Sequence, residues 1–474
     1  MSRHATNPWV VLVLVCVAQF MVVLDATIVN VALPSIGKDM EVQPDSLQWL
    51  VNAYALVFGG FLLLGGRVGD LLGRKRFFLI GLVIFTAASF VNGIAGSLGL
   101  LIAGRSLQGL GAALISPAAL SIISTTFAEG KERARALGVW AAIAIGGSAV
   151  GLILGGVLTE YFSWPWIFFV NVPVGIAAFL FSLRLVPESR DVHAHQHYDI
   201  FGAITVTFGL MTLVYGIVET NHGWTSAKVL TAFAVSAVLL VSFVVIELRS
   251  HAPLVRLSIF RVRSLLTANV SMFLVSSGIF AMFFFNTLYI QGTLHFSPVQ
   301  AGLAFLPFTG GIMISAGLAS QFAPKIGVRP VAAVGMLLSI AGLLLLTQLP
   351  VDGTYVANVL PSLLLTSLGM GAVFMPLTLV ATTGLEDSDQ GLASGLFNTS
   401  QQIGGALGLA ILTTIATSHV ANPKNPADVV TGYHWAFAGS AVFVLGSLVS
   451  MLALLRKEHV AKIEAGAEAA TVAI

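Results

Sequence analysis

The residue best placed to do chemistry is an aspartate inside an apolar stretch. Asp25 lies in the mostly apolar run from Val10 to Ile36. Such a run can cross a bilayer, which takes about 20 apolar residues. Holding a carboxylate near the middle of a span costs roughly 2.5–3.5 kcal/mol on insertion scales. We therefore expect Asp25 either to bind and release a proton or to hydrogen-bond a neighbouring helix.

Arg105 is a second charge inside an apolar span. Arg105, Gln108 and Gly109 follow at helical spacing and share one face. At 1.5 Å per residue, Arg105 lies roughly 10 Å from the start of its span, and Asp25 lies roughly 13 Å from the end of its own. These similar depths predict an Asp25–Arg105 pair. Arg105 could take part in the function of Asp25, could neutralise Asp25 structurally, or could do both.

The composition indicates which elements hold these charges. Of the 474 residues, 57% are hydrophobic and 9% are charged, whereas about 25% are charged in a typical soluble domain. The chain is therefore predicted to be an all-α polytopic membrane protein without a soluble domain. Fourteen apolar runs predict the transmembrane helices: 8–33, 47–66, 77–96, 98–123, 136–158, 166–186, 199–218, 228–248, 265–291, 298–322, 328–349, 354–381, 391–417 and 434–455.

Two halves of six spans flank two inserted helices. The predicted parts are a first bundle over 8–186, the inserted helices with their linkers over 187–264, a second bundle over 265–455 and a tail over 456–474. The halves form a weak repeat, a pattern common in transporters. In that repeat Asp25 aligns with Phe285 and Arg105 aligns with Leu365. Proton chemistry is therefore expected in the first half.

The basic residues predict the orientation. With a cytoplasmic N-terminus and alternating spans, all but a few of the 23 Lys and Arg residues fall on the cytoplasmic side, as the positive-inside rule requires. An even number of spans then places both termini inside. The net charge of +2 is a sum over two faces and indicates no nucleic-acid partner. Cys16 is the only cysteine, so no intrachain disulfide can form.

A turn between the second and third spans has a specific pattern. It contains Gly66, Asp70, Gly73, Arg74 and Lys75. Its glycines allow close backbone approach and positive φ, and an aspartate such as Asp70 suits a helix N-terminus. We predict a tight cytoplasmic turn between two helices.

Glycines also recur in the fifth span. Gly147, Gly151 and Gly155 are spaced by four residues, and Gly156 follows directly. Small residues at this spacing let two membrane helices pack closely. We predict that the fifth span packs closely against another helix through these glycines.

These patterns resemble those of a known transporter family. The Gly66–Lys75 turn is similar to the signature loop of the major facilitator superfamily, with Leu71 where the family has Arg. The run Leu24–Pro34 and the Arg105-x-x-Gln108-Gly109 pattern resemble motifs of its fourteen-span drug/proton antiporters. The glycine repeat resembles the family's antiporter motif, from which it departs at Leu152, and this resemblance implies that its close packing acts as a gate between conformations. The WPWIFFVNVP stretch also resembles a family motif, from which it departs at Pro165.

The resemblance implies export of hydrophobic drugs, antibiotics or secondary metabolites across the bacterial cytoplasmic membrane. The two halves would rock about a central cavity, and Asp25 would take a proton from outside and release it inside. The proton gradient would supply the energy, because the chain has no Walker sequence. The resemblance implies no enzyme activity and no cofactor, and the protein is expected to function as a monomer in the lipid bilayer. A non-transporting ligand sensor and a nutrient uptake symporter stay open as alternatives.

The substrate cavity is predicted to be apolar and aromatic. Its candidate residues are Gln108, Met282, Phe285, Asn286 and Tyr289. Methionine and aromatic side chains suit hydrophobic ligands, although the same residues could pack or face lipid. Because Asp25 is the one acid well inside a predicted span, we expect neutral, weakly basic or anionic aromatic substrates rather than dications.

Two smaller features have alternative interpretations. Trp49 and Tyr54, in the second span, are either membrane-interface anchors or cavity residues. His193, His195 and His197 alternate in a predicted cytoplasmic linker and could bind a transition metal, but we predict no metal site in so short a loop.

Overall fold

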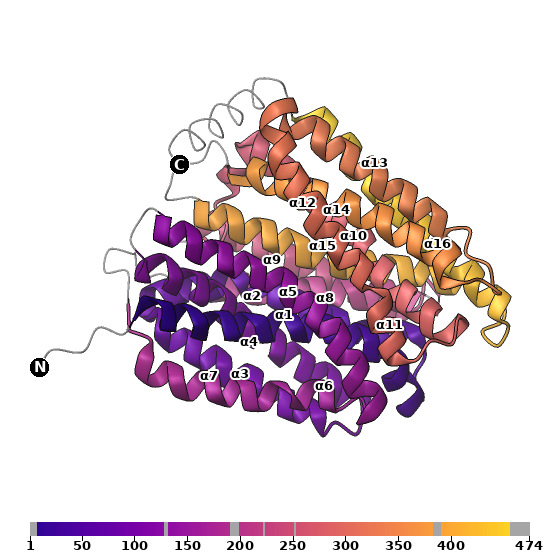
Figure 1. The fold of residues 1–474 in the computed structure, drawn as a ribbon, viewed down its shortest axis with the longest axis horizontal. Helices are drawn as coiled ribbons and strands as arrows, with labels where there is room; N and C mark the ends of the chain where they lie inside the picture. The colour runs from indigo at the N-terminus through magenta and orange to yellow at the C-terminus, as the bar shows by residue number, and fades with distance from the viewer. Residues whose placement is uncertain are drawn as a thin grey trace, which may run out of the picture. The chain divides into compact units, whose positions relative to one another are not determined.

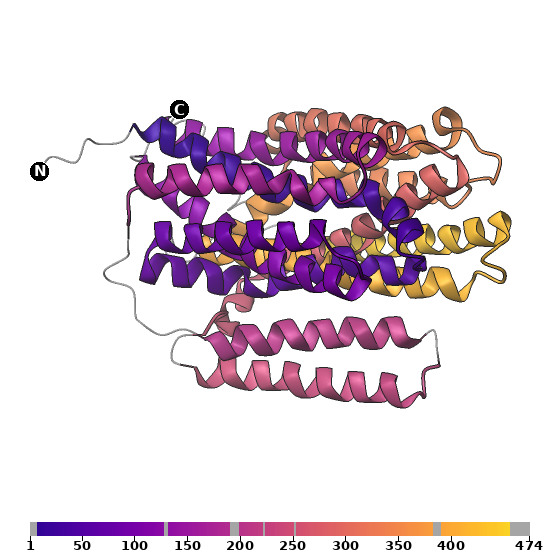
Figure 2. The ribbon, with the colours of Figure 1, turned by 90° about the horizontal axis from the view of Figure 1, so that it is seen from below.

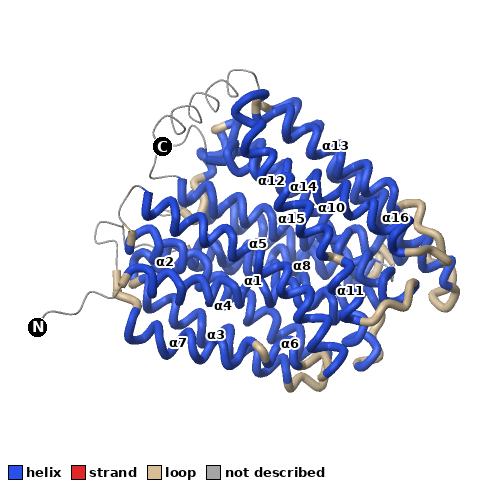
Figure 3. Tube along the Cα trace, in the orientation of Figure 1, coloured by secondary structure: helices blue, strands red, loops and turns tan. Residues whose placement is uncertain are grey.

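A computed structural model describes residues 7–127, 131–189, 199–220, 223–250, 253–382 and 390–455, and within these ranges the chain is helical (Figures 1 and 3). The first helices are α1 (Pro8–Asp39), α2 (Pro44–Leu72), α3 (Arg74–Gly93), α4 (Leu98–Thr126), α5 (Lys131–Tyr161), α6 (Trp166–Phe169) and α7 (Asn171–Leu185). The inserted pair is α8 (Ile200–Glu219) and α9 (Ala227–Arg249). The last helices are α10 (Arg263–Leu288), α11 (Pro298–Ala304), α12 (Leu306–Ile326), α13 (Val328–Leu346), α14 (Leu360–Thr382), α15 (Gln390–Ser418) and α16 (Pro426–Leu454), with short helical turns at η2 (Leu257–Arg261), η3 (Tyr289–Thr293) and η4 (Tyr355–Val359).

Every predicted span falls on a helix. The described residues contain 12 helices that are long and apolar enough to cross a membrane. The predicted spans 136–158 and 391–417 fall on α5 and α15, which are 31 and 29 residues long. The total of fourteen spans and the cytoplasmic location of both termini stay predictions.

Capping residues and glycines define several helix ends. The Asn7 side chain accepts a hydrogen bond from the Trp9 backbone N–H, and Pro8 follows Asn7 as the first residue of α1, as expected at a helix start. Gly73 ends α2 and precedes α3 with φ of +122°, and Gly327 joins α12 to α13 with φ of +91°. Both glycines adopt a backbone conformation that disfavours side chains.

The chain divides into two compact units. Unit 1 comprises residues 1–208, 239–254 and 297–303, and unit 2 comprises 209–238, 255–296 and 304–474. The predicted first bundle, 8–186, lies wholly in unit 1. The predicted second bundle, 265–455, lies in unit 2 except for 297–303.

Each unit has its own helix packing. In unit 1, α1 packs against α4, α5 and α7, while α4 also packs against α2 and α3. In unit 2, α10 packs against α14, α15 and α16, and α13 packs against α14 and α16. The inserted helices α8 and α9 lie side by side as an antiparallel pair (Figure 2), joined by a hydrogen bond of 2.8 Å from the Ser236 hydroxyl to the Gly209 carbonyl.

The interior of unit 1 surrounds the predicted charges with apolar side chains. Buried residues of α1, α3 and α4 form one cluster, which includes Met21, Val22, Phe85 and Ala112. An apolar setting makes hydrogen bonds strong and unpaired polar groups costly. Any polar side chain here is therefore expected to have partners.

Candidate functional site

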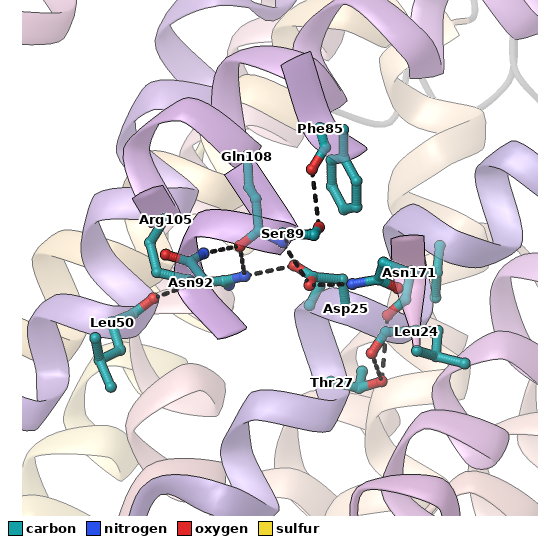
Figure 4. Close-up of polar contacts among 12 residues, drawn as sticks. Leu24, Asp25, Thr27, Leu50, Phe85, Ser89, Asn92, Arg105, Gln108 and Asn171 are labelled. Atoms are coloured by element: carbon teal, nitrogen blue, oxygen red, sulfur yellow. Dashed lines mark hydrogen bonds and ion pairs between the residues drawn. The ribbon is translucent and has the colours of Figure 1, made fainter. Parts of the chain in front are cut away.

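Asp25 and Arg105 form a buried ion pair in unit 1. The α1 helix brings Asp25 to the α4 helix, where Arg105 Nη1 donates to Asp25 Oδ2 (Figure 4). Asp25 is fully buried, and Arg105 is 1% exposed. The pair predicted from the depths of the two residues is therefore confirmed. Its role in proton transfer stays a prediction.

Two amide groups complete the surroundings of the Asp25 carboxylate. Gln108 Nε2 and Asn171 Nδ2 each donate to Asp25 Oδ1 at 2.8 Å. An ionised carboxylate only accepts hydrogen bonds, whereas a protonated one needs an acceptor for its O–H. The three donors, from α4 and α7, therefore match the ionised form of Asp25.

Gln108 is the centre of this polar network. Its Oε1 accepts from Arg105 Nη1 at 2.9 Å and from Asn92 Nδ2 at 2.7 Å. Its Nε2 also donates to the Ser89 hydroxyl at 2.8 Å, and that hydroxyl donates to the Phe85 carbonyl. Sequence reasoning placed Gln108 in the substrate cavity. The structure places its side chain inside the network, fully buried, and its contact with substrate stays a prediction.

Arg105 has further partners on α2. Its Nε donates to the Leu50 carbonyl at 3.0 Å, and its guanidinium carbon lies 4.4 Å from the centre of the Tyr54 ring. Tyr54 is 5% exposed, so its interpretation as a membrane-interface anchor is wrong. Its ring packs on the buried cation instead.

Sequence reasoning missed three residues of the network. Ser89 and Asn92 lie one turn apart on α3, and Asn171 begins α7. A signal existed for each, because polar residues at helical spacing inside an apolar span indicate a shared polar face, and Asn171 falls within the WPWIFFVNVP stretch. Neutral polar residues are common in membrane helices, however, so sequence alone did not separate these three from the others.

The glycines of α5 lie against α1 on both sides of Asp25. A Cβ atom added to Gly151 would lie 2.9 Å from the Leu24 carbonyl oxygen, and one added to Gly155 would lie 2.9 Å from the Ile28 carbonyl oxygen. At Gly147 the nearest atom is a methyl carbon of Val23 at 3.2 Å. The close helix packing predicted from the glycine spacing is therefore present, whereas its role as a gate stays a prediction.

Gly156 faces a different partner within unit 1. A Cβ atom there would lie 2.6 Å from the Pro298 carbonyl oxygen and 2.7 Å from Val299 Cα, both at the start of α11. The Glu160 side chain accepts a hydrogen bond of 2.9 Å from the Val299 backbone N–H. Leu152, where the family motif has proline, is buried in an unbroken α5 helix.

The departure at Pro165 has a local explanation. Pro165 directly precedes the short helix α6 and has φ of −57°. Its carbonyl accepts hydrogen bonds from the backbone N–H groups of Phe168 and Phe169. A proline ring fixes φ near this value and therefore favours the start of a helix.

The α2–α3 turn is held by the end of α7. The Glu188 carboxylate accepts from the Lys75 backbone N–H at 3.1 Å, and Lys75 Nζ donates to the Leu183 carbonyl at 2.8 Å. The Arg74 backbone N–H donates to the Ser189 carbonyl at 3.1 Å. Sequence reasoning missed Glu188, although an acid near a helix N-terminus is favourable.

The structure describes Gly66 and Gly73 of the turn fully, but not every other side chain. Gly66 lies at an approach of α2 to α4, where an added Cβ would be 3.3 Å from Pro117 Cβ. Gly73 has the positive φ that the pattern predicted. The side chains of Asp70 and Leu71 lie outside those the structure describes.

The remaining cavity candidates lie in the packed interior of unit 2. Met282, Phe285 and Asn286 on α10 and Tyr289 in η3 are each at most 2% exposed. The Phe285 ring contacts the rings of Phe284, Tyr433 and Phe437. The Tyr289 hydroxyl donates to the Pro350 carbonyl at 2.7 Å, and Asn286 Nδ2 donates to the Met282 carbonyl at 3.0 Å. Their contact with substrate stays a prediction.

No candidate metal centre occurs in the part of the chain that the structure describes, where no three His, Cys, Asp or Glu residues group together in a way that could hold an ion. His193, His195 and His197 lie outside the described residues.

The sequence and the fold are both similar to those of known proteins. A family profile described as Major Facilitator Superfamily matches residues 15–409. The puromycin resistance protein pur8 of Streptomyces alboniger is 38% identical over 449 residues, which cover 93% of this chain and 89% of that protein. The cephamycin export protein CmcT of Amycolatopsis lactamdurans is 40% identical over 444 residues, covering 92% and 90%.

Solved structures share the fold at low identity. A crystal structure of a variant of the nucleoside transporter NupG superimposes with a TM-score of 0.64 at 13% identity, covering 95% of this chain and all of that chain. The peptide transporter POT in complex with sulfate gives a TM-score of 0.64 at 15% identity, covering 94% and 95%. At this identity the likeness concerns the fold alone.

Proposed function

Because the chain belongs to the Major Facilitator Superfamily, we propose that this multi-pass membrane protein exports hydrophobic small molecules in exchange for protons. Two of its relatives are named for resistance to puromycin and for export of cephamycin. Both names concern movement of, or protection from, an antibiotic. They favour export over nutrient uptake for this chain.

The observation that carries the proton-coupled part is the buried Asp25–Arg105 pair. An intramembrane ionisable residue held at this cost is expected to work in transport. Asp25 is held by donors from two helices, α4 and α7, and is flanked by the tight α1–α5 contact. A change in its charge therefore acts where three helices meet α1.

The proposed cycle follows from this geometry. Ionised Asp25 accepts from Arg105, Gln108 and Asn171 and thereby fixes α1 against α4 and α7. A proton on the carboxylate removes its charge and weakens its hydrogen bonds to the three donors, which loosens α1. Binding energy that differs between two conformations can then shift their populations. Alternation between the conformations moves the proton inward and the substrate outward.

The proposal is tested with puromycin and a weakly basic fluorescent dye in everted membrane vesicles that have an acidified lumen. The wild-type protein should accumulate one or both compounds against a gradient, and collapse of the pH gradient should stop accumulation. The Asp25→Asn variant should fold, because its side-chain oxygen still accepts from Arg105, but should not accumulate substrate. Accumulation by Asp25→Asn at the wild-type rate would refute the assignment. Binding without accumulation by the wild type would favour a sensor.

A further inference from the structure

Tyr54 supports the buried cation of the pair. The Arg105 guanidinium carbon lies 4.4 Å from the centre of the Tyr54 ring, within the distance at which a cation is attracted to the negative face of an aromatic ring. Both side chains are buried, and exclusion of water strengthens such an attraction. The ring therefore acts on the charge of Arg105 directly.

The α2–α4 packing is shaped to allow this contact. Gly109 lies one turn after Arg105, and a Cβ atom there would be 2.6 Å from the Tyr54 carbonyl oxygen and 3.2 Å from the Phe58 backbone nitrogen. The glycine lets the two backbones approach closely beside the ring. The Tyr54 hydroxyl is buried and makes no hydrogen bond to the residues that the structure describes. The aromatic face, rather than the hydroxyl, is therefore the part that acts on Arg105.

Protonation of Asp25 would leave Arg105 as a buried cation without its anion. Its other partners are the Leu50 carbonyl at 3.0 Å, Gln108 Oε1 at 2.9 Å and the Tyr54 ring. A buried cation that loses its counter-ion is strongly destabilising unless other groups take over. We propose that Tyr54 is a positioning residue of the proton cycle, whose ring holds the Arg105 guanidinium while Asp25 is neutral. This inference rests on the proposed function.

A double-mutant cycle on the purified full-length protein tests this role without measuring transport. Asp25→Asn mimics the neutral carboxyl group, and Tyr54→Leu removes the aromatic face. Tyr54→Leu should lower the Tm more in the Asp25→Asn background than in the wild type, because the two groups share one cation. Tyr54→Phe keeps the aromatic face and should leave the Tm of each background nearly unchanged. Equal losses in the two backgrounds, or a Tyr54→Phe loss as large as that of Tyr54→Leu, would overturn the proposal.

A second set of variants, with aromatic rings of nearly equal size, keeps the test valid if Tyr54→Leu does not fold. Phenylalanine and its mono-, di- and trifluorinated forms are introduced at position 54 in the Asp25→Asn background. Fluorine withdraws electron density from the ring face, so the Tm should fall stepwise along the series. A flat series would overturn the proposal. Proton-driven export by Asp25→Asn would instead refute the proposed function, so the two failures are distinguishable.

Discussion

At Asp25, one carboxylate joins three helices. Oδ2 accepts from the Arg105 guanidinium, while Oδ1 accepts from the amides of Gln108 and Asn171. The amides do not change charge with pH, so they remain donors throughout any proton cycle. The site is therefore more than a pair of opposite charges, because two of the three groups that donate to Asp25 are neutral amides on α4 and α7.

Asn171→Leu should measure the contribution of one neutral donor. Removal of a buried hydrogen bond to a charged group costs about 1.5–3 kcal/mol, whereas a bond between neutral groups contributes about 0.5–1.5 kcal/mol. The substitution should therefore lower the free energy of unfolding more in the wild type than in Asp25→Asn, as measured by thermal or denaturant unfolding in detergent. Equal losses in the two backgrounds would show that Asn171 does not act through the Asp25 charge.

The charged residues of the site could be predicted from the sequence, but most of their neutral partners could not. Asp25 and Arg105 are conspicuous because charges are rare inside apolar spans, and their depths give the pairing. Asn171 and Ser89 resemble many polar residues that join membrane helices. Tyr54 has an aromatic side chain that fits an interface as well as an interior, and only the packing of α2 on α4 places its ring on Arg105.

At the scale of helices, the glycine repeat explains why α1 and α5 pack so closely around Asp25. Carbonyl oxygens of α1 lie only 2.9 Å from the positions that Cβ atoms of Gly151 and Gly155 would occupy. A side chain at these positions must push two backbones apart. Any movement of α1 that follows Asp25 protonation would therefore be transmitted to α5.

Gly151→Leu should separate this packing from a general effect of leucine on α5. Overpacking of this kind costs about 1–3 kcal/mol, and we expect strongly reduced transport at normal membrane expression. Gly146→Leu is the matched control, because an added Cβ at Gly146 meets no atom within 4 Å; it should transport normally. Full transport activity of Gly151→Leu in the same vesicles would show that close α1–α5 packing is not needed for transport.

Helix positions were predictable from apolar runs, whereas several helix ends were not. The first span was predicted to end at residue 33, but α1 continues to Asp39 with Pro34 inside it. Proline is tolerated within membrane helices where neighbouring groups satisfy the freed carbonyl. The predicted span 166–186 contains the break between α6 and α7, because short interruptions leave the average hydrophobicity unchanged.

At the scale of the molecule, the two units share a weak sequence repeat but differ in charge. In unit 1 the network holds a buried acid and a buried base, whereas the aligned positions in unit 2 carry Phe285 and Leu365. The sequence was sufficient to predict this asymmetry, because it depends on residue types alone. The substrate-binding residues were harder to predict, since apolar side chains at helix faces pack, face lipid or bind ligand with the same pattern.

Asp25 is the one acid well inside a predicted span, and this predicts which substrate charges the protein prefers. A dication in a low-dielectric cavity needs more than one carboxylate, and Asp25 is already paired with Arg105. Neutral, weakly basic or anionic aromatic compounds should therefore compete for export better than divalent cations. Competitive transport of neutral, monovalent and divalent dyes measures this preference. Preferred export of the divalent dye would contradict it.

The central claim is that substrate export and proton entry are one exchange that passes through Asp25. The most direct measurement uses proteoliposomes that contain the purified protein and a pH-sensitive dye. A gradient of the compound that accumulates in vesicles is imposed without a pH gradient. The wild-type protein should move protons in the direction opposite to the substrate, and Asp25→Asn should move none. Substrate flux without proton flux in the wild type, or equal proton flux in Asp25→Asn, would contradict the account.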